Sequence, residues 1–140
     1  MSFFLRLIWV LPVTLLGLLV ALLVCVTGGA VSRKEGVLEA AGGWPAWVLR
    51  RGFPFSGSVA AITLGHVVVG VSVEALAATR VHERVHVRQF EQWGVLFLLA
   101  YPLAGIVAWI RGGDPYRDNR FEREARAAEQ KWHEGVNVPK

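Results

Sequence analysis

The chain has 140 residues, 54% of them hydrophobic, and a formal net charge of +4. This length suits one domain. The single cysteine, Cys25, excludes an intrachain disulfide. Basic residues occur in scattered pairs, such as Arg33-Lys34 and Arg50-Arg51, without a nucleic-acid-binding motif, so we expect no nucleic-acid partner.

The N-terminal segment is apolar and uncharged from residue 7 to residue 26. About 20 such residues are enough for a helix to cross a hydrocarbon core of ~30 Å. A cleavable signal peptide is the alternative, but its apolar region usually has only about 7–15 residues. We therefore predict a retained single-pass membrane anchor over residues 1–28 and a separate domain over residues 29–140. The flanking charges do not decide on which side of the membrane this domain lies.

Three segments after the anchor are expected to form a small antiparallel β-sheet. Residues 36–41 and 46–50 lie between turns that contain glycine and proline. Residues 59–73 are rich in Val, Ile and Thr and include glycines, a composition that favours a strand or a hairpin. At about 15 residues, this segment is also short for a membrane span. With the helices that follow in the chain, these strands predict an α+β fold.

Residues 74–93 are mostly good helix formers without Pro or Gly, and Gly94 follows as a stop signal. This predicted helix contains His82, Glu83 and His86, which spell H-E-x-x-H. The two histidines are one turn apart on one face, so both imidazoles can bind one Zn²⁺ at roughly 2.0–2.1 Å. Glu83 can then reach a water molecule beside the metal rather than the metal itself. Gln89 shares the same face and can orient a ligand or meet substrate.

Residues 95–110 form a second apolar stretch, which is interrupted by Pro102, and we expect an apolar helix or a bent hairpin there. A charged tail follows. In this tail Asp118 or Asn119 can cap a last helix that runs to about residue 134. The tail helix is therefore the place to look for a third metal ligand.

The start of the tail helix offers Glu122 and Glu124 as the third ligand, and helical geometry alone does not choose between them. If residues 95–110 crossed a bilayer, His86 and Glu122 would lie about 30 Å apart, whereas both must lie within about 2.2 Å of one ion. We therefore expect residues 95–110 to turn back, with an apolar face at the membrane interface. Less favoured ligand candidates are Glu129, His133 and Glu134.

The motif and the tail together resemble a known family. Residues 122–125 (Glu-Arg-Glu-Ala) are similar to the Glu-x-x-Ala/Ser helix of gluzincin zinc metallopeptidases, although Arg126 stands where Asp is common. The metzincin class is excluded because Gln89 and Gln92 occupy its Gly and His positions. The pattern HExxHxxQ … NxFExEA also resembles small uncharacterised bacterial membrane proteins with a gluzincin-like core, over roughly the last 80 residues. This resemblance implies that Glu122 is the third ligand, with Glu124 as the runner-up.

These observations predict a membrane-associated zinc metallopeptidase that hydrolyses peptide bonds. His82, His86 and Glu122 would hold one Zn²⁺, and Glu83 would be the general base. The predicted partners are a peptide or protein substrate and the lipid bilayer. The alternatives are a protein that uses the same ligands for structural zinc and a membrane scaffold whose H-E-x-x-H is accidental. Further residues expected to orient a ligand or contact substrate are Gln89, His66 and Tyr101.

Overall fold

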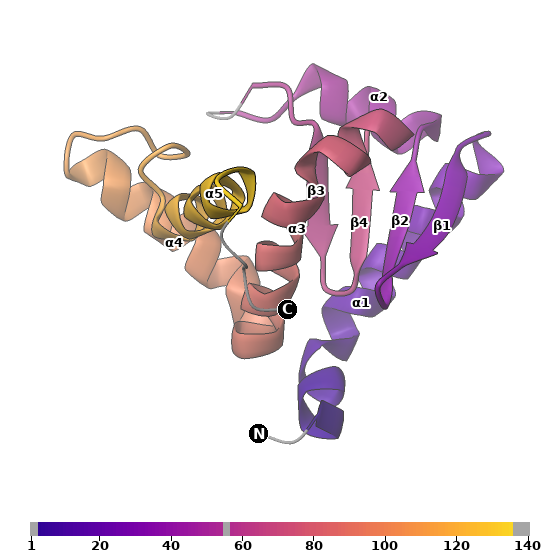
Figure 1. Ribbon diagram of the computed structural model, residues 1–140, viewed down its shortest axis with the longest axis horizontal. Coiled ribbons are helices and arrows are strands. Elements are labelled where there is room, and N and C mark those ends of the chain that lie inside the picture. Colours follow the sequence, from indigo (N-terminus) through magenta and orange to yellow (C-terminus); the bar gives the residue numbers. More distant parts are fainter. Residues whose placement is uncertain (1–2, 55–56, 136–140) are drawn as a thin grey trace.

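The computed structural model describes residues 3–54 and 57–135, which form a mixed α+β fold (Figure 1). A four-stranded sheet lies between helices, and two further helices extend from one side of it. In chain order the elements are α1 (Phe3–Val26), β1 (Ala30–Lys34), β2 (Val37–Ala41), α2 (Gly43–Arg51), β3 (Ala61–Leu64), β4 (Val67–Gly70), α3 (Val73–Trp93), the 3₁₀ turn η1 (Gly94–Leu96), α4 (Phe97–Ile110) and α5 (Arg120–His133).

The sheet is mixed, with strand order β1-β2-β4-β3, so the prediction of a purely antiparallel sheet was wrong. β1–β2 and β3–β4 are antiparallel hairpins, but β2 and β4 pair in parallel. This pairing arises because α2 carries the chain from β2 to the far edge, where β3 forms and β4 then returns beside β2. The predicted hairpin within residues 59–73 is confirmed.

Residues 46–50 belong to helix α2 and not to a strand, which corrects the prediction for that segment. Pro45 lies in the first turn of α2, where a residue without an N–H is tolerated. Ala46 and Leu49 are three residues apart and both are buried, which gives the short helix one packed face. The edge strand β1 was not predicted, and it occupies part of a segment that the sequence leaves as a glycine-rich connection.

Helices cover both faces of the sheet. On one face, Val67 and Val69 pack with Ala21 and Val24 of α1. On the other face, Val68 packs with residues of α3. β4 is therefore buried on both sides, as expected of a central strand next to a parallel neighbour. Helix α1 also approaches the sheet closely at Gly17, where an added Cβ would lie 2.7 Å from the Leu64 carbonyl oxygen and from Val67.

The predicted motif helix is confirmed as α3. The side chain of Ser72 accepts a hydrogen bond from Ala75 N–H at its start, and Gly94, with φ of 56°, ends it. Residues 97–110 form a single helix despite Pro102. A core of aromatic rings joins α4, which we call the arm, to α3 and α5. The ring centroid of Phe97 lies 4.5 Å from that of Phe90 and 4.9 Å from that of Phe121.

Two stretches of the described residues are long and apolar enough to cross a membrane, Phe4–Val26 and Val73–Ile110. The second is not one straight helix, because it joins α3, η1 and α4. A signal sequence or a core helix meets the same criteria, so length and composition alone do not place either stretch in a membrane.

Candidate metal centre

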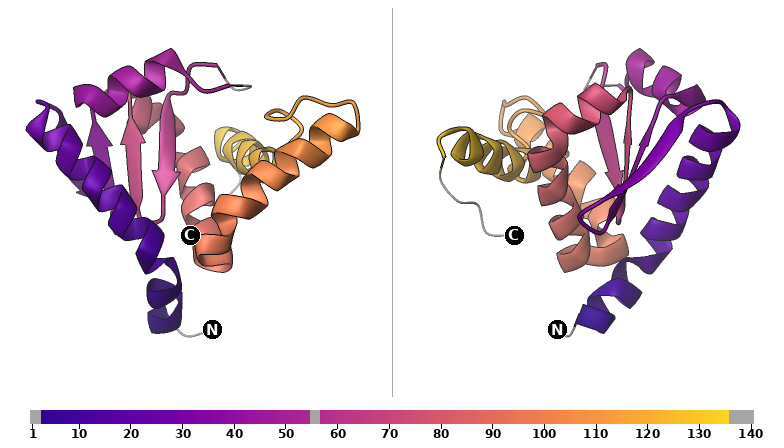
Figure 2. Two further views of the ribbon diagram at one scale, coloured as in Figure 1. Left: turned by 180° about the vertical axis from the view of Figure 1, so that it is seen from behind. Right: turned by 45° about the vertical axis from the view of Figure 1, so that its right-hand side comes forward.

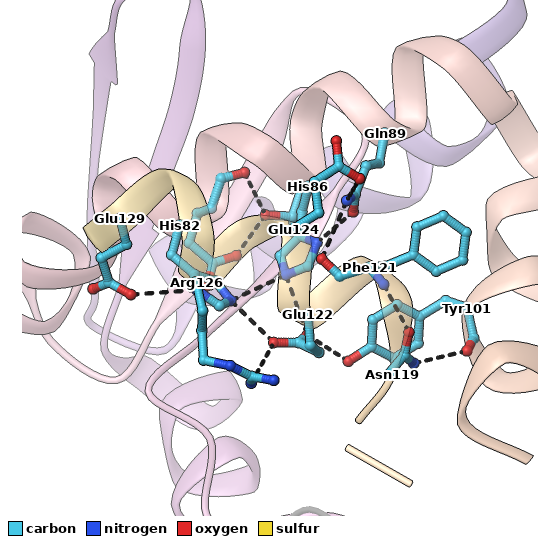
Figure 3. A network of polar contacts seen from close by, with 12 residues as sticks. His82, His86, Gln89, Tyr101, Asn119, Phe121, Glu122, Glu124, Arg126 and Glu129 are labelled. Atoms are coloured by element: carbon cyan, nitrogen blue, oxygen red, sulfur yellow. Dashed lines mark hydrogen bonds and ion pairs between the residues drawn. The ribbon is translucent and has the colours of Figure 1, made fainter. Parts of the chain in front are cut away.

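The two motif histidines on α3 meet one carboxylate from α5, as Figure 3 shows. His82 Nε2 and His86 Nε2 are 3.2 Å apart. Glu122 Oε2 lies 3.2 Å from His82 Nε2, and Glu122 Oε1 lies 3.2 Å from His86 Nε2. His86 and Glu122 are buried, at 7% and 2% exposure. The chain therefore turns back after α4, as the sequence argument requires, and this group could hold a metal ion.

The spacing of these atoms fits a small tetrahedral cation. Bonds of about 2.0–2.1 Å at tetrahedral angles place neighbouring ligand atoms about 3.3–3.4 Å apart. The two imidazole nitrogens are 3.2 Å apart, close to this value, and each lies 3.2 Å from a different oxygen of Glu122. One ligand atom from each of the three residues lies within 4.8 Å of the other two. Among the described residues, the buried Glu122 Oε2 makes ion-pair contacts with His82 Nε2 at 3.2 Å and with the Arg126 guanidinium at 3.8 Å. A buried carboxylate oxygen that faces an imidazole in this way is an acceptor that a cation can also satisfy.

Glu122 is held as an ionised group. Burial raises the pKa of this carboxyl, but hydrogen bonds from His82, His86 and Tyr101 outweigh burial and set the pKa well below its usual range. The Tyr101 hydroxyl donates to Glu122 Oε1 at 2.6 Å. Glu122 does not cap its own helix, because the Asn119 N–H that a capping glutamate would bind donates to the Tyr116 carbonyl oxygen.

Gln89 is the polar link between the metal-binding face of α3 and α5. It is 1% exposed. Its side-chain N–H groups donate to the Phe121 carbonyl oxygen at 3.2 Å and to Glu124 Oε2 at 3.0 Å. Its remaining polar atom, Oε1, lies 2.8 Å from His86 Nδ1, so His86 must donate from Nδ1. In the neutral imidazole this tautomer leaves the lone pair on Nε2, the atom a metal needs, whereas in the protonated imidazole Nε2 donates to Glu122.

The surroundings of the His86 imidazole raise its pKa, so this side chain is more easily protonated than a free histidine. Burial lowers the pKa of His86, but the hydrogen bond to Glu122 and the negative charges of Glu83 and Glu122 raise it more, so the net shift is upward. The other histidine has a looser partner, since His82 Nδ1 lies 3.6 Å from Glu129 Oε2. A carboxylate on the far nitrogen of a ligating imidazole strengthens it as a metal ligand.

Glu83 is buried beside this group and is fixed by strand β3. The Thr63 hydroxyl donates to Glu83 Oε2 at 2.7 Å, and both residues are about 5% exposed (Thr63 6%, Glu83 5%). The second carboxylate oxygen of Glu83 is free of this bond. Thr63 was not singled out from the sequence, because the pairing of residues 20 positions apart depends on how β3 docks on α3.

We refer to the side chains of His82, His86 and Glu122 together as the metal group. A cleft of about 770 Å³ opens over it between β3, α3 and α4. A smaller hollow of about 270 Å³ adjoins it on the other side of His82 and Glu83. The Tyr116 side chain lines both, and burial together with the charge of Glu122 raises its pKa to about 12. Tyr101 also lines the larger cleft, so two protonated phenols face the space above the metal group.

The structure brings together most, but not all, of the predicted site residues. Glu124 accepts from Gln89 and does not join the histidines, which favours Glu122 as the third ligand. His66 lies in the turn between β3 and β4, where its Nε2 is 3.0 Å from Glu91 Oε1, and it does not line the cleft. Sequence reasoning missed Thr63 at the site. It offered Glu129 as a less favoured ligand, whereas this carboxylate lies beside the far nitrogen of His82.

Comparison of the chain with protein-family models, curated proteins and solved structures found no match in any of the three sets. The geometry of the site therefore carries the functional argument by itself.

Proposed function

We propose that the protein is a membrane-associated zinc metallopeptidase of gluzincin type. The observation that supports this most directly is the convergence of His82, His86 and Glu122 beside the buried carboxylate of Glu83. Two imidazole nitrogens and one carboxylate oxygen form a donor set typical of catalytic zinc, and they leave one tetrahedral position for water or substrate. The resemblance of the H-E-x-x-H motif and the tail to gluzincins agrees with the same assignment.

The residues around the cleft can divide the work of peptide hydrolysis. A bound zinc ion would supply Lewis-acid polarisation of the scissile carbonyl and lower the pKa of the attacking water. Glu83 takes the proton from that water and passes it to the departing amine. Thr63 holds one oxygen of Glu83, so the other is directed to the reacting groups. The raised pKa of Tyr116 keeps its hydroxyl protonated, which suits it to donate to a developing oxyanion.

An extended peptide fits the shape of this site. Among the strands of residues 3–54 and 57–135, β3 pairs only with β4, so its outer edge has no strand neighbour there, and its residues line both hollows. A peptide laid along this edge gains main-chain hydrogen bonds that do not depend on its sequence. The two hollows meet at His82 and Glu83, so the peptide can extend on both sides of the bond that is cut.

Membrane association is part of the same proposal. The exposed face of α1 is lined by large apolar side chains, including Leu15, Leu19 and Leu22 at 52%, 65% and 59% exposure. A helix of this kind attaches a protein to a membrane either by crossing it once, as the sequence predicts, or by lying in its surface.

A structural zinc site is the second candidate, and one observation favours it. Glu122 joins α5 to α3, and α5 has its main helix contact with α3, so a metal there would also fix the tail helix to the rest of the fold. Catalytic and structural zinc differ in their need for Glu83, which is not a ligand in either case.

The test uses full-length protein with Glu83→Gln and, as matched control, Glu91→Gln on the same helix. Zinc content and cleavage of a fluorogenic peptide library are measured for each. We expect one zinc per chain in all three proteins and a loss of about 10²–10⁴-fold in hydrolysis only for Glu83→Gln. Zinc without any hydrolysis by the wild type would identify the site as structural. Absence of zinc from purified, metal-supplied protein would leave the scaffold alternative.

A further inference from the structure

Helix α1 is packed along the sheet and not separated from it. Val13 and Val24 are 1% and 0% exposed, and the backbone at Gly17 abuts Val67. Val67 is level with Leu38 in the parallel pair, and Leu38 is level with Arg33 in the β1–β2 hairpin. Arg33 and the neighbouring Lys34 therefore lie at the depth of Gly17, the middle of α1.

This register is incompatible with α1 crossing a bilayer. A crossing helix would place Arg33 and Lys34 near the centre of the hydrocarbon layer, although both are exposed side chains at a sheet edge. It would also immerse the open edge of β1, whose outward N–H and C=O groups have no strand partner in the described part of the chain. Open sheet edges facing lipid do not occur at that depth, because their polar groups stay unsatisfied. The helix can instead lie along the membrane surface, with only its outer face in lipid.

Helix α4 needs the same apolar environment. It has no charged residue, and its outer side chains Leu99, Leu103 and Ile110 are 64%, 58% and 72% exposed. A helix that is apolar all round is normally enclosed by protein or by lipid. The outer face of α4 is not covered by the rest of the described protein. Its 14 residues extend about 21 Å, which is too short to cross a hydrocarbon core of ~30 Å.

The two apolar helices face the same side of the molecule. Seen from behind, in the left view of Figure 2, α1 and α4 both lie toward the viewer and diverge from a common end. At that end Gly94 abuts the indole of Trp9. Near the other end of α1, Trp44 and Trp47 are exposed on α2, and the Arg51 guanidinium lies 4.1 Å from the Trp47 ring centroid. Exposed tryptophan and arginine beside an apolar face are typical of a membrane–water interface.

The cleft over His82, His86 and Glu122 opens between β3, α3 and α4, so of the two apolar helices only α4 lines it. Its α4 wall includes Leu98, Ile106 and Trp109, which are 42%, 50% and 66% exposed, so the cleft lining continues without a break into the outer surface of α4. A folded partner would have to cover two diverging helices and the recess beside α4. Acyl chains are fluid and fill such a surface without a matching shape.

We propose that α1 and α4 lie in one leaflet of a membrane without crossing it, and that the cleft opens into that leaflet. The cleft then takes up the apolar segment of a membrane-embedded peptide, which reaches the metal group from the lipid and not from water. The choice of substrate rests on the proposed peptidase function, whereas the position in the leaflet does not.

The orientation is tested with single-cysteine variants in a Cys25→Ser background, bound to preformed sealed vesicles that contain anionic lipid. Arg6→Cys marks the N-terminal end of α1, and Arg51→Cys, on α2, marks the side of the molecule where α1 ends. We expect both to react with a membrane-impermeant maleimide added outside. Reaction of one only, with the other reacting after the vesicles are solubilised, means that α1 crosses and overturns the proposal.

Lipid contact is measured with an environment-sensitive fluorophore on a second set of variants. Leu19→Cys reports the outer face of α1, Ile106→Cys reports the cleft wall, and Arg33→Cys is the water-side control. Lipids that carry a nitroxide at a shallow acyl position should quench the first two and spare the third. Quenching at Leu19 without quenching at Ile106 would show that the cleft opens to water.

The substrate is tested by presenting one apolar fluorogenic peptide with and without an acyl chain that anchors it to the vesicles. Confinement beside the cleft should raise cleavage of the anchored form about 10²-fold or more, with Glu83→Gln as the blank. Equal cleavage of both forms overturns delivery from lipid and keeps the peptidase. Cleavage of neither form, with the expected labelling and quenching, overturns the peptidase and keeps the lipid-facing cleft.

Discussion

Glu122 and Glu124 offer a matched pair for testing the metal centre, because they lie on the same turn of α5 but contact different groups. Glu122 faces both histidines at 3.2 Å, whereas Glu124 accepts from Gln89 at 3.0 Å. Replacing each by glutamine keeps the size of the side chain and removes its charge. Glu122→Gln can still accept the Tyr101 hydrogen bond, so the aromatic packing of the arm should survive.

The size of the expected loss follows from the number of ligands. Structural zinc sites with four ligands bind with about 10–16 kcal/mol, or roughly 3–4 kcal/mol per ligand. At 1.4 kcal/mol per tenfold, loss of the Glu122 carboxylate should weaken zinc binding by about 10²–10³-fold. Glu124→Gln leaves Gln89 its bond to the Phe121 carbonyl oxygen, so the orientation of His86 is largely kept and the loss should not exceed about 10-fold.

The assay is competition for zinc with a chromophoric chelator, with circular dichroism to confirm that each variant is folded. Equal losses for Glu122→Gln and Glu124→Gln, or full affinity in Glu122→Gln, would refute the assignment of the third ligand. The pH dependence adds a check. Because the pKa of Glu122 is lowered and that of His86 is raised above 6.5, proton competition should come from the histidine, and wild-type affinity should rise as the pH increases through the range above 6.5.

Three further changes separate the roles of neighbouring residues. Thr63→Val removes a hydrogen bond to ionised Glu83, worth about 1.5–3 kcal/mol, and should lower kcat about 10–100-fold with zinc content unchanged, while Thr63→Ser restores it. Gln89→Leu should weaken zinc binding about 10–100-fold in the same competition assay, since His86 loses its orienting partner. Hydrogen bonds and charge from Arg80 lower the pKa of Glu39 below 4.5, so its stabilising effect is full above pH 4.5 and is lost as the pH falls through the lowered value. Urea titrations should therefore show a stability gap between wild type and Glu39→Gln that shrinks below about pH 4.5, and a constant gap would contradict this.

Local signals explain what could be predicted from the sequence. The motif helix carries its own start, stop and spacing, with Ser72 before it and Gly94 after it, so its bounds and the facing histidines follow from helix geometry alone. The tail helix is equally self-contained, since Asn119, one of its two predicted caps, accepts a hydrogen bond from Phe121 N–H. The preference for Glu122 over Glu124 came from the family resemblance and not from helix geometry.

What the sequence did not provide depends on contacts between distant segments. The parallel pairing of β2 with β4 is decided by the path of α2, which no residue pattern in either strand encodes. Thr63 reads as an ordinary β-branched strand residue until β3 docks beside Glu83. Residues 46–50 are too few for periodicity to distinguish helix from strand, and burial of one face against α1 decides for the helix.

A middle residue of the motif, Arg84, shows why the site faces the cleft. Arg84, together with Arg80 four positions earlier, lies on the side of α3 that meets β2, and there both arginines donate to Glu39 at 2.9 to 3.2 Å. Glu39 is 5% exposed, so rotating α3 about its axis would leave this carboxylate buried without a partner, which is strongly unfavourable. The ion network on one face of the helix thus fixes its rotation, and that rotation directs His82 and His86 away from the sheet and toward Glu122.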